Sequence, residues 1–187
     1  MSPVDFSSLI GLYRKMDAAY DQVAARYGFH CNGCEDNCCR SLFFHHTFIE
    51  KAFLIHGFSQ MEKAVQRQIR QRAAAYVSRT FCDGGVHRSL KLMCPLNNQG
   101  RCTLYFFRPM ICRLHGLPHE LHPPGRPMVS GPGCDAGNFS ATPYIPFDRT
   151  PFYVQMCALE HSFRQESVRT GKLRETLAQM LAPEVTL

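Results

Sequence analysis

The chain has 187 residues, of which 45% are hydrophobic and 19% charged, and its formal net charge is +6. This composition excludes a disordered chain, and the length suits a single domain over residues 1–187. The charge favours an acidic protein partner but is too small to indicate nucleic acid.

The sequence shows no sign of export or membrane insertion. Its first residues contain no uninterrupted apolar stretch, which argues against a secretory signal peptide. No apolar run approaches the roughly 20 residues of a membrane span. We therefore expect a cytoplasmic protein that does not bind membranes. Cytoplasmic thiols stay reduced, so its ten cysteines favour metal binding over disulfides.

Helical patterns lie toward both ends of the chain. Ser2-Pro3-Val4-Asp5 is typical of a helix start, and Gly28 closes the apolar pattern that follows. Ser59 and Glu62 have the spacing of a capping box and predict the start of a long helix. Residues 41–44 are expected to form a short strand or a buried extended segment. The predicted helices cover about 2–28, 47–57, 59–80, 150–171 and 173–181.

The segment from Cys82 to Pro151 differs from the rest of the chain in composition and periodicity. It holds ten of the twelve prolines and eight of the thirteen glycines, and it sustains no helical period. So long an irregular segment is uncommon in a compact domain and needs another source of order. Its five cysteines could supply that order. The predicted fold is therefore mostly α, with helices from both chain ends flanking an irregular, loop-rich, cysteine-bound metal centre.

The densest thiol cluster is CNGCEDNCC, which begins at Cys31. Cys31-x-x-Cys34 is a tight turn that aims two sulfurs at one centre, as a tetrahedral metal or an iron–sulfur cluster requires. The adjacent side chains of Cys38 and Cys39 diverge. We therefore expect one of them to bind the metal while the other bridges, binds a second centre or packs.

Further ligands must come from the irregular segment. The thiols there are Cys94, Cys102, Cys112 and Cys134. Arginines stand next to or near three thiol positions, and their guanidinium groups could offset the negative charge of buried thiolates. The alternative is that they are ordinary surface arginines. The residues in question are Arg40, Arg101, Arg108 and Arg113.

Four motifs in order resemble a known family. The thiol cluster is followed by Cys94-Pro95-Leu96, by Gly100-Arg101-Cys102-Thr103-Leu104-Tyr105, and by Arg108-Pro109-x-x-Cys112-Arg113. This combination, within about residues 29–135, resembles the CxxCxxCC, or YkgJ-like, family of zinc- or iron-chelating proteins. A variant of the cluster also occurs in flagellin lysine-N-methylases. The resemblance implies a ligand set of Cys31, Cys34, Cys38, Cys39, Cys94, Cys102 and Cys112, with Cys134 as a weaker eighth candidate.

The chain departs from the family pattern at two places. Three residues separate Cys34 from Cys38 where the family name implies two, and Leu114-His115-Gly116-Leu117-Pro118 follows the last motif instead of a Tyr or Phe and Pro. The first departure leaves the placement of the paired cysteines around the metal open.

The spacing of the thiols bears on the metal. Zinc is usually held by two Cys-x-x-Cys hairpins, and this chain has only one. Iron–sulfur clusters combine a tight cysteine group with remote cysteines, so the spacing favours a cluster, expected to be of the 4Fe–4S type, over zinc. Two zinc sites, or one cluster with a redox pair of thiols, remain open.

Other metal-ligand residues are expected to have structural roles. His115, His119 and His122 could supply one ligand, but the prolines among them favour polar loop residues. Cys157 lies in an apolar helix pattern and is predicted to be a small buried hydrophobe. A metal pair formed by Cys157 and His161 is the less favoured interpretation.

The sequence contains no common nucleotide-binding or hydrolase motif. The predicted function is metal binding through the cysteine cluster, for redox chemistry, sensing or metal handling. One alternative is a metal-dependent, methylase-like modifying enzyme, in which a thiol such as Cys39 acts as a nucleophile. The other is an interaction module with a structural zinc, whose basic face (Lys63, Arg67 and Arg70) binds an acidic protein. That face could also be merely solvated.

Overall fold

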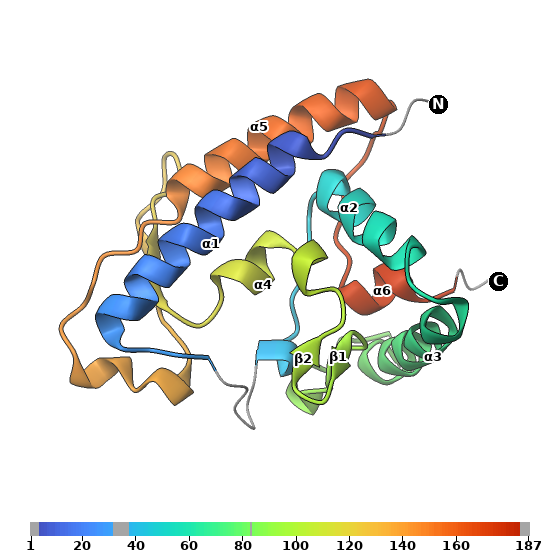
Figure 1. Cartoon of the computed structure of the whole chain (residues 1–187), viewed down its shortest axis with the longest axis horizontal. Coiled ribbons are helices and arrows are strands. Elements are labelled where there is room, and N and C mark those ends of the chain that lie inside the picture. The colour runs from blue at the N-terminus through green and yellow to red at the C-terminus, as the bar shows by residue number, and fades with distance from the viewer. Residues whose placement is uncertain (1–3, 32–37, 83, 184–187) are drawn as a thin grey trace. The chain divides into compact units, whose positions relative to one another are not determined.

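A computed structural model describes residues 4–31, 38–82 and 84–183 of the chain. This part is mostly helical and contains six α-helices and two two-stranded antiparallel sheets (Figure 1). The prediction of a mostly α protein is confirmed. None of its helices is long and apolar enough to cross a membrane, within the described residues. The chain divides into two compact units, 1–34 with 110–168 and 35–109 with 169–187. The expectation that residues 1–187 form a single domain stays a prediction.

Unit 1 (1–34 and 110–168) combines two long helices with a small hairpin. The helices α1 and α5 lie side by side, and the short α4 also contacts α1 (Figure 1). The hairpin pairs Pro118 with Pro132 and Leu121 with Val129. The elements of unit 1 are α1 (Ser7–Tyr27), α4 (Met110–Leu114), β3 (Pro118–Leu121), β4 (Val129–Pro132) and α5 (Thr150–Ser167), with 3-10 turns at Asp135–Gly137 and Phe139–Ala141.

Unit 2 (35–109 and 169–187) is built on a core shared by three helices and a second hairpin. Leu54, Ile69, Leu96 and Leu181 are each at most 1% exposed and belong to one contiguous cluster. The elements of unit 2 are α2 (Phe48–Ser59), α3 (Lys63–Thr80), β1 (Asn97–Asn98), β2 (Arg101–Cys102) and α6 (Leu177–Leu181), with 3-10 turns at Cys38–Arg40, Arg88–Leu90 and Tyr105–Phe107.

The first helix ends where the sequence predicted and begins later. Gly28 adopts a left-handed φ of 61°, and its N–H donates to the carbonyl of Ala25. Glycine adopts this conformation at low cost, which explains the stop. Residues 4–6 are not helical, so α1 begins at Ser7 and not near Asp5. The Asp5 carboxylate accepts hydrogen bonds from the N–H and hydroxyl of Ser7.

The predicted capping box at Ser59 is wrong. Ser59 is the last residue of α2, and its hydroxyl donates to the His56 carbonyl. The following helix begins only at Lys63, with no side-chain cap hydrogen bond. Two hydrogen bonds compete for the Ser59 hydroxyl, which explains the error. A serine hydroxyl can bind a carbonyl at the end of one helix as well as an N–H at the start of the next.

Residues 41–44 form no strand, and none of them is fully buried. The predicted irregular segment of residues 82–151 contains more order than expected, namely both hairpins and α4. Strands of two to four residues leave too little alternation for a pattern to reveal.

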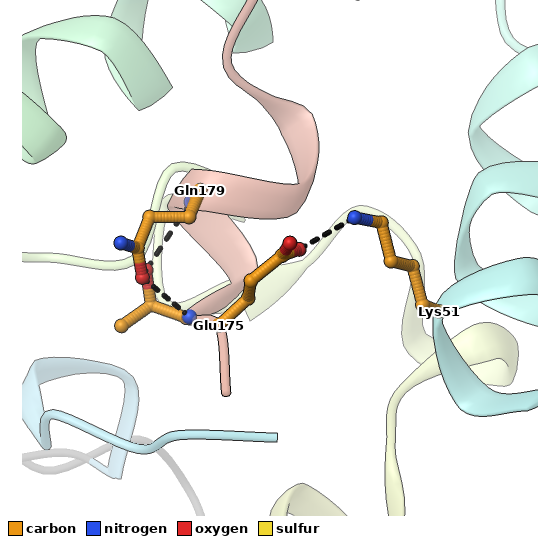
Figure 2. Close-up of polar contacts among 4 residues, drawn as sticks. Lys51, Glu175 and Gln179 are labelled. Atoms are coloured by element: carbon orange, nitrogen blue, oxygen red, sulfur yellow. Dashed lines mark hydrogen bonds and ion pairs between the residues drawn. The ribbon is translucent and has the colours of Figure 1, made fainter. Parts of the chain in front are cut away.

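Of the two C-terminal helices, α5 starts at the predicted place, whereas α6 starts at Leu177 and not at the predicted residue 173. Thr150 and Pro151 open α5, which ends at Ser167. The last helix begins at the Thr176 cap, where Thr176 and Gln179 exchange side-chain and backbone hydrogen bonds (Figure 2). The buried face of α5 is Met156, Glu160 and Phe163. Cys157 is exposed, so the prediction of a buried hydrophobe is wrong.

A backbone bridge ties the C-terminal segment of unit 2 to the segment before α2. His45 N–H donates to the Glu175 carbonyl at 2.7 Å, and Glu175 N–H donates back at 3.2 Å. The Lys51 ammonium contacts the Glu175 carboxylate at 2.6 Å (Figure 2). The His45 side chain is 3% exposed. Burial, and then the charge of His46, lower the His45 pKa to about 4, so this imidazole is neutral at pH 7.

The buried His45 predicts acid sensitivity. The His45 pKa is about 4 in the folded chain, against 6.5 for an ordinary histidine of the unfolded chain. Between pH 4 and pH 6.5 the unfolded chain therefore binds a proton that the folded chain does not. Stability present above pH 6.5 is therefore lost as the pH falls toward 4. Between pH 7 and 5 we expect the free energy of unfolding to fall by about 2 kcal/mol more in the wild type than in His45→Gln.

Urea unfolding at both pH values measures the difference. His56→Gln, at an exposed position of α2, should keep the wild-type pH dependence. Equal pH dependence in His45→Gln and the wild type would contradict the assignment.

Candidate metal centre

A short hairpin brings Cys94 close to Cys102. The pairing of β1 with β2 sets Asn97 opposite Cys102. Asn97 N–H donates to the Cys94 carbonyl at 2.9 Å, which folds the chain just before the hairpin. The turn residues Gln99 and Gly100 have φ values of 50° and 84°. Two consecutive positive φ angles are typical of the tight turns that match the twist of paired strands. Residues eight positions apart therefore lie near each other.

Each of these two thiols is followed by a buried leucine two residues later. Leu96 is 1% exposed and Leu104 is 4% exposed, and both belong to the unit 2 core. The Leu96 N–H donates to the Cys94 sulfur, and the Leu104 N–H donates to the Cys102 sulfur. Hydrogen bonds of this kind favour the thiolate form that binds metals. The repeated Cys-x-Leu pattern thus anchors a leucine in the core and orients a sulfur.

Cys39 joins the same cluster from a distant part of the chain. The Cys94 N–H donates to the Cys39 carbonyl at 2.8 Å. The Cys39 thiol interacts electrostatically with both Cys94 and Cys102, and those two also interact with each other. Unit 2 therefore gathers three predicted ligands, which we call the thiol cluster: Cys39, Cys94 and Cys102.

The thiol cluster disfavours negative charge in the absence of a cation. Burial raises the Cys94 pKa to about 12, and the neighbouring Cys39 and Cys102 thiols add to the increase. Burial also raises the pKa of Cys102, with a further contribution from Cys39. A bound metal cation would reverse this preference, because it stabilises the thiolate directly.

Two arginines offset part of this cost. Arg108, named by the sequence as a candidate, acts to lower the Cys102 pKa, while its guanidinium stacks on Tyr105 at 3.7 Å from the ring centroid. Arg72 acts to lower the Cys94 pKa and donates to the Asn97 carbonyl at 3.0 Å. The sequence analysis missed Arg72, which is 22 positions from Cys94 on another element. Arg40 and Arg101 are exposed.

The other candidate ligands lie either in unit 1 or outside the described residues. Cys112 lies on α4, and the Cys134 N–H donates to the carbonyl of Gly116, two residues after that helix. Both are partly exposed, whereas Cys31 is exposed just after α1. Cys34 and the Cys38 side chain lie outside the described residues.

Arg113 has a clear role within unit 1. It is 4% exposed, its guanidinium contacts the Asp17 carboxylate at 2.6 Å, and it lies over the Tyr13 ring at 4.0 Å from the centroid. Asp17 and Tyr13 both belong to α1, so Arg113 ties α4 to α1. This ion pair and the Tyr13 ring contact account for its burial.

The three loop histidines are not gathered around a common point. Burial and the nearby Arg149 lower the pKa of His115 and of His119. The His122 imidazole lies 3.8 Å from the Glu120 carboxylate, near the surface. Within residues 4–31, 38–82 and 84–183, no group of three or more His, Cys, Asp or Glu side chains is arranged to hold a metal ion. The three thiols of the thiol cluster are therefore not arranged as a metal site within the described residues.

No protein-family model, curated protein or solved structure matches this chain. The resemblance to the CxxCxxCC family therefore stays a prediction from the motifs.

The Arg113 ion pair predicts a stability defect in a variant. Arg113→Met removes the cation that contacts the Asp17 carboxylate and the Tyr13 ring. We expect the free energy of unfolding to fall by about 2 kcal/mol, below the usual range for a fully buried pair because Asp17 is partly exposed. Urea denaturation measures the loss. Arg26→Met, at an exposed position of α1, is the matched control, and equal stability of the two variants would contradict this role.

Proposed function

We propose that this chain is a metal-binding protein and that Cys39, Cys94 and Cys102 contribute ligands to an iron–sulfur cluster or a zinc ion. The observation that carries the proposal is the convergence of three thiols from separate sequence motifs onto one place in unit 2. Thiols that only filled space in a core would not need two backbone N–H groups directed at their sulfurs.

The chemistry of the cluster fits these metals. Thiolates are soft ligands, which suit zinc and iron–sulfur clusters and disfavour magnesium or calcium. The charge of three thiolates is partly offset by Arg72 and Arg108, which act on Cys94 and Cys102. When bound, a cluster would supply one-electron redox chemistry, and a zinc ion would supply structural cross-linking. We retain the preference for a cluster of the 4Fe–4S type that the thiol spacing indicates.

The remaining ligands are proposed from the sequence motifs. Cys38 belongs to the same motif and the same unit as Cys39 and is the first candidate to complete its site. Cys31, Cys34, Cys112 and Cys134 lie in unit 1 and stay candidate ligands on the strength of the motif resemblance. The proposed roles are redox chemistry, sensing or metal handling in the cytoplasm.

A metal here would also contribute to folding. The segment that carries Cys94 and Cys102 is held by a four-residue hairpin ladder, by the two leucine anchors and by hydrogen bonds to Cys39 and Arg72. Cross-linking it to Cys39 would stabilise unit 2, because the binding free energy of a structural metal adds to the free energy of folding.

Metal analysis of cysteine variants tests the proposal. Protein purified without oxygen should contain either iron with acid-labile sulfide and visible absorption, or zinc without colour. Cys94→Ser and Cys102→Ser should each lose most of that metal, since serine is a much weaker ligand for both. Cys157→Ser, at an exposed position of α5, is the matched control and should retain it. Full metal content in Cys94→Ser and Cys102→Ser, or no stoichiometric metal in the wild type, would overturn the proposal.

A further inference from the structure

The net positive charge of the chain comes from unit 2. That unit contains fourteen lysines and arginines against seven acidic residues, a net charge of +7, whereas unit 1 has seven against eight, a net charge of −1. The overall value of +6 is the sum of these two net charges. A polyanionic partner is therefore attracted by unit 2, where the charge is large enough to matter.

Within unit 2 the charge is concentrated on α3. Its 18 residues include five cations and no acidic residue, and all five cations are exposed. In the part of the chain that the structure describes, no carboxylate forms an ion pair with them. The five cations are Lys63, Arg67, Arg70, Arg72 and Arg79.

A merely solvated helix face would be arranged differently. Surface helices usually mix both signs of charge, and like charges four residues apart, such as Lys63 and Arg67, destabilise a helix. α5 shows the ordinary arrangement, with Glu160 and Arg164 joined at 2.6 Å. The one-sided charge of α3 is therefore a cost to the fold that a polyanionic partner would relieve.

The cations form two flanks with an uncharged strip between them. At about 100° per residue, Lys63, Arg67 and Arg70 fall on one flank of the exposed surface. Arg72 and Arg79 fall on the opposite flank, about 170° away. The buried face of the helix, at Gln66, Ile69, Ala73 and Thr80, points to the core. The outermost exposed strip consists of Ala64, Gln68, Gln71, Ala75 and Ser78.

The arrangement of the two basic flanks distinguishes a flat polyanionic partner from a concave one. A flat acidic protein surface would meet the outermost strip, which is uncharged, and would leave the two flanks out of reach. A concave partner with negative charge on both walls would contact both flanks while the strip faces its floor. The major groove of duplex DNA is about 12 Å wide and carries a phosphate backbone on each side, and a helix with its side chains is about 10–12 Å across.

The side chains of α3 suit this geometry. Guanidinium groups bind phosphate oxygens with two parallel hydrogen bonds, and four of the five cations are arginines. Small residues allow close approach to the groove floor, and glutamine side chains can hydrogen-bond to base edges there. The helix has 18 residues, or about 27 Å, enough to follow the groove along its exposed length.

We propose that α3 of unit 2 is a binding element for duplex DNA that enters the major groove, with its two basic flanks on the two phosphate backbones. This proposal does not depend on the metal centre. Arg72 also contacts Asn97 and acts on Cys94, so it is left unchanged in the test below.

Fluorescence anisotropy of the full chain with a labelled duplex of mixed sequence tests the proposal, at about 50 to 200 mM salt. The variant R67Q/R70Q/R79Q removes three exposed cations from both flanks. We expect its affinity to fall by about tenfold or more at the lowest salt. The slope of log affinity against log salt should fall in magnitude by about 2.7, at 0.9 for each lost phosphate contact.

The matched control is R14Q/K15Q/R26Q, which removes the same charge from exposed positions of α1 in unit 1. It should lose about twofold at most, with a nearly unchanged salt slope. Circular dichroism and metal content of both variants should equal those of the wild type, which separates a binding defect from a folding or metal defect.

Three results would overturn the proposal. One is equal binding by the two triple variants, or no binding to the duplex at low salt. Another is tighter binding to the single strand of the same length, which has no groove. The last is displacement of the duplex by poly-glutamate at equal charge concentration, with the poly-glutamate affinity lost in R67Q/R70Q/R79Q, which would assign α3 to an acidic protein.

Discussion

The burial of Leu96 and Leu104 is the constraint on which the candidate centre depends. Each leucine lies two residues after a cysteine, and each is almost fully enclosed by the unit 2 core. Enclosing a leucine side chain is worth about 2 kcal/mol, enough to hold a hairpin whose ladder has only two residues on each strand. The hairpin brings Cys94 and Cys102 near each other, and the two leucines that follow them anchor it in the unit 2 core.

The same packing creates an electrostatic cost at the sulfurs. Three thiols close together in a partly buried place disfavour the thiolate form that a metal needs, as the raised pKa values of Cys94 and Cys102 show. Backbone N–H groups and two arginines reduce this cost without removing it. A bound cation would remove the remaining cost, as the proposed metal centre requires.

Much of the fold could be predicted because helix signals are local. Gly28 closes the first helix through its own φ angle, and Thr150-Pro151 opens α5 where the pattern indicated. The error at Ser59 arose because one hydroxyl can serve either of two neighbouring helices. Cys157 was wrongly predicted to be buried, although helical geometry contained the signal. It lies about 100° from Met156, off the face formed by Met156, Glu160 and Phe163.

The candidate site was less accessible to sequence reasoning. The motifs identified Cys39, Cys94 and Cys102 as ligand candidates, but they did not say which cysteines lie together. Arg72 had no sequence signal at all, because its contact with Asn97 joins α3 to a hairpin 25 residues away. Arg113 is the opposite case, because the sequence did offer a signal. Its position beside Cys112 suggested a thiolate partner, and the structure shows an ion pair with Asp17.

By itself, the sequence determined the presence of the helices, the end of α1, the start of α5 and the inventory of thiols, since propensity, capping and residue type act over a few neighbours. The tertiary structure alone decided three things: which thiols meet, which arginine faces them, and where the positive charge gathers. Each unit is assembled from two stretches of chain that are distant in the sequence. Contacts and net charge per unit are therefore properties of residues that only folding brings together.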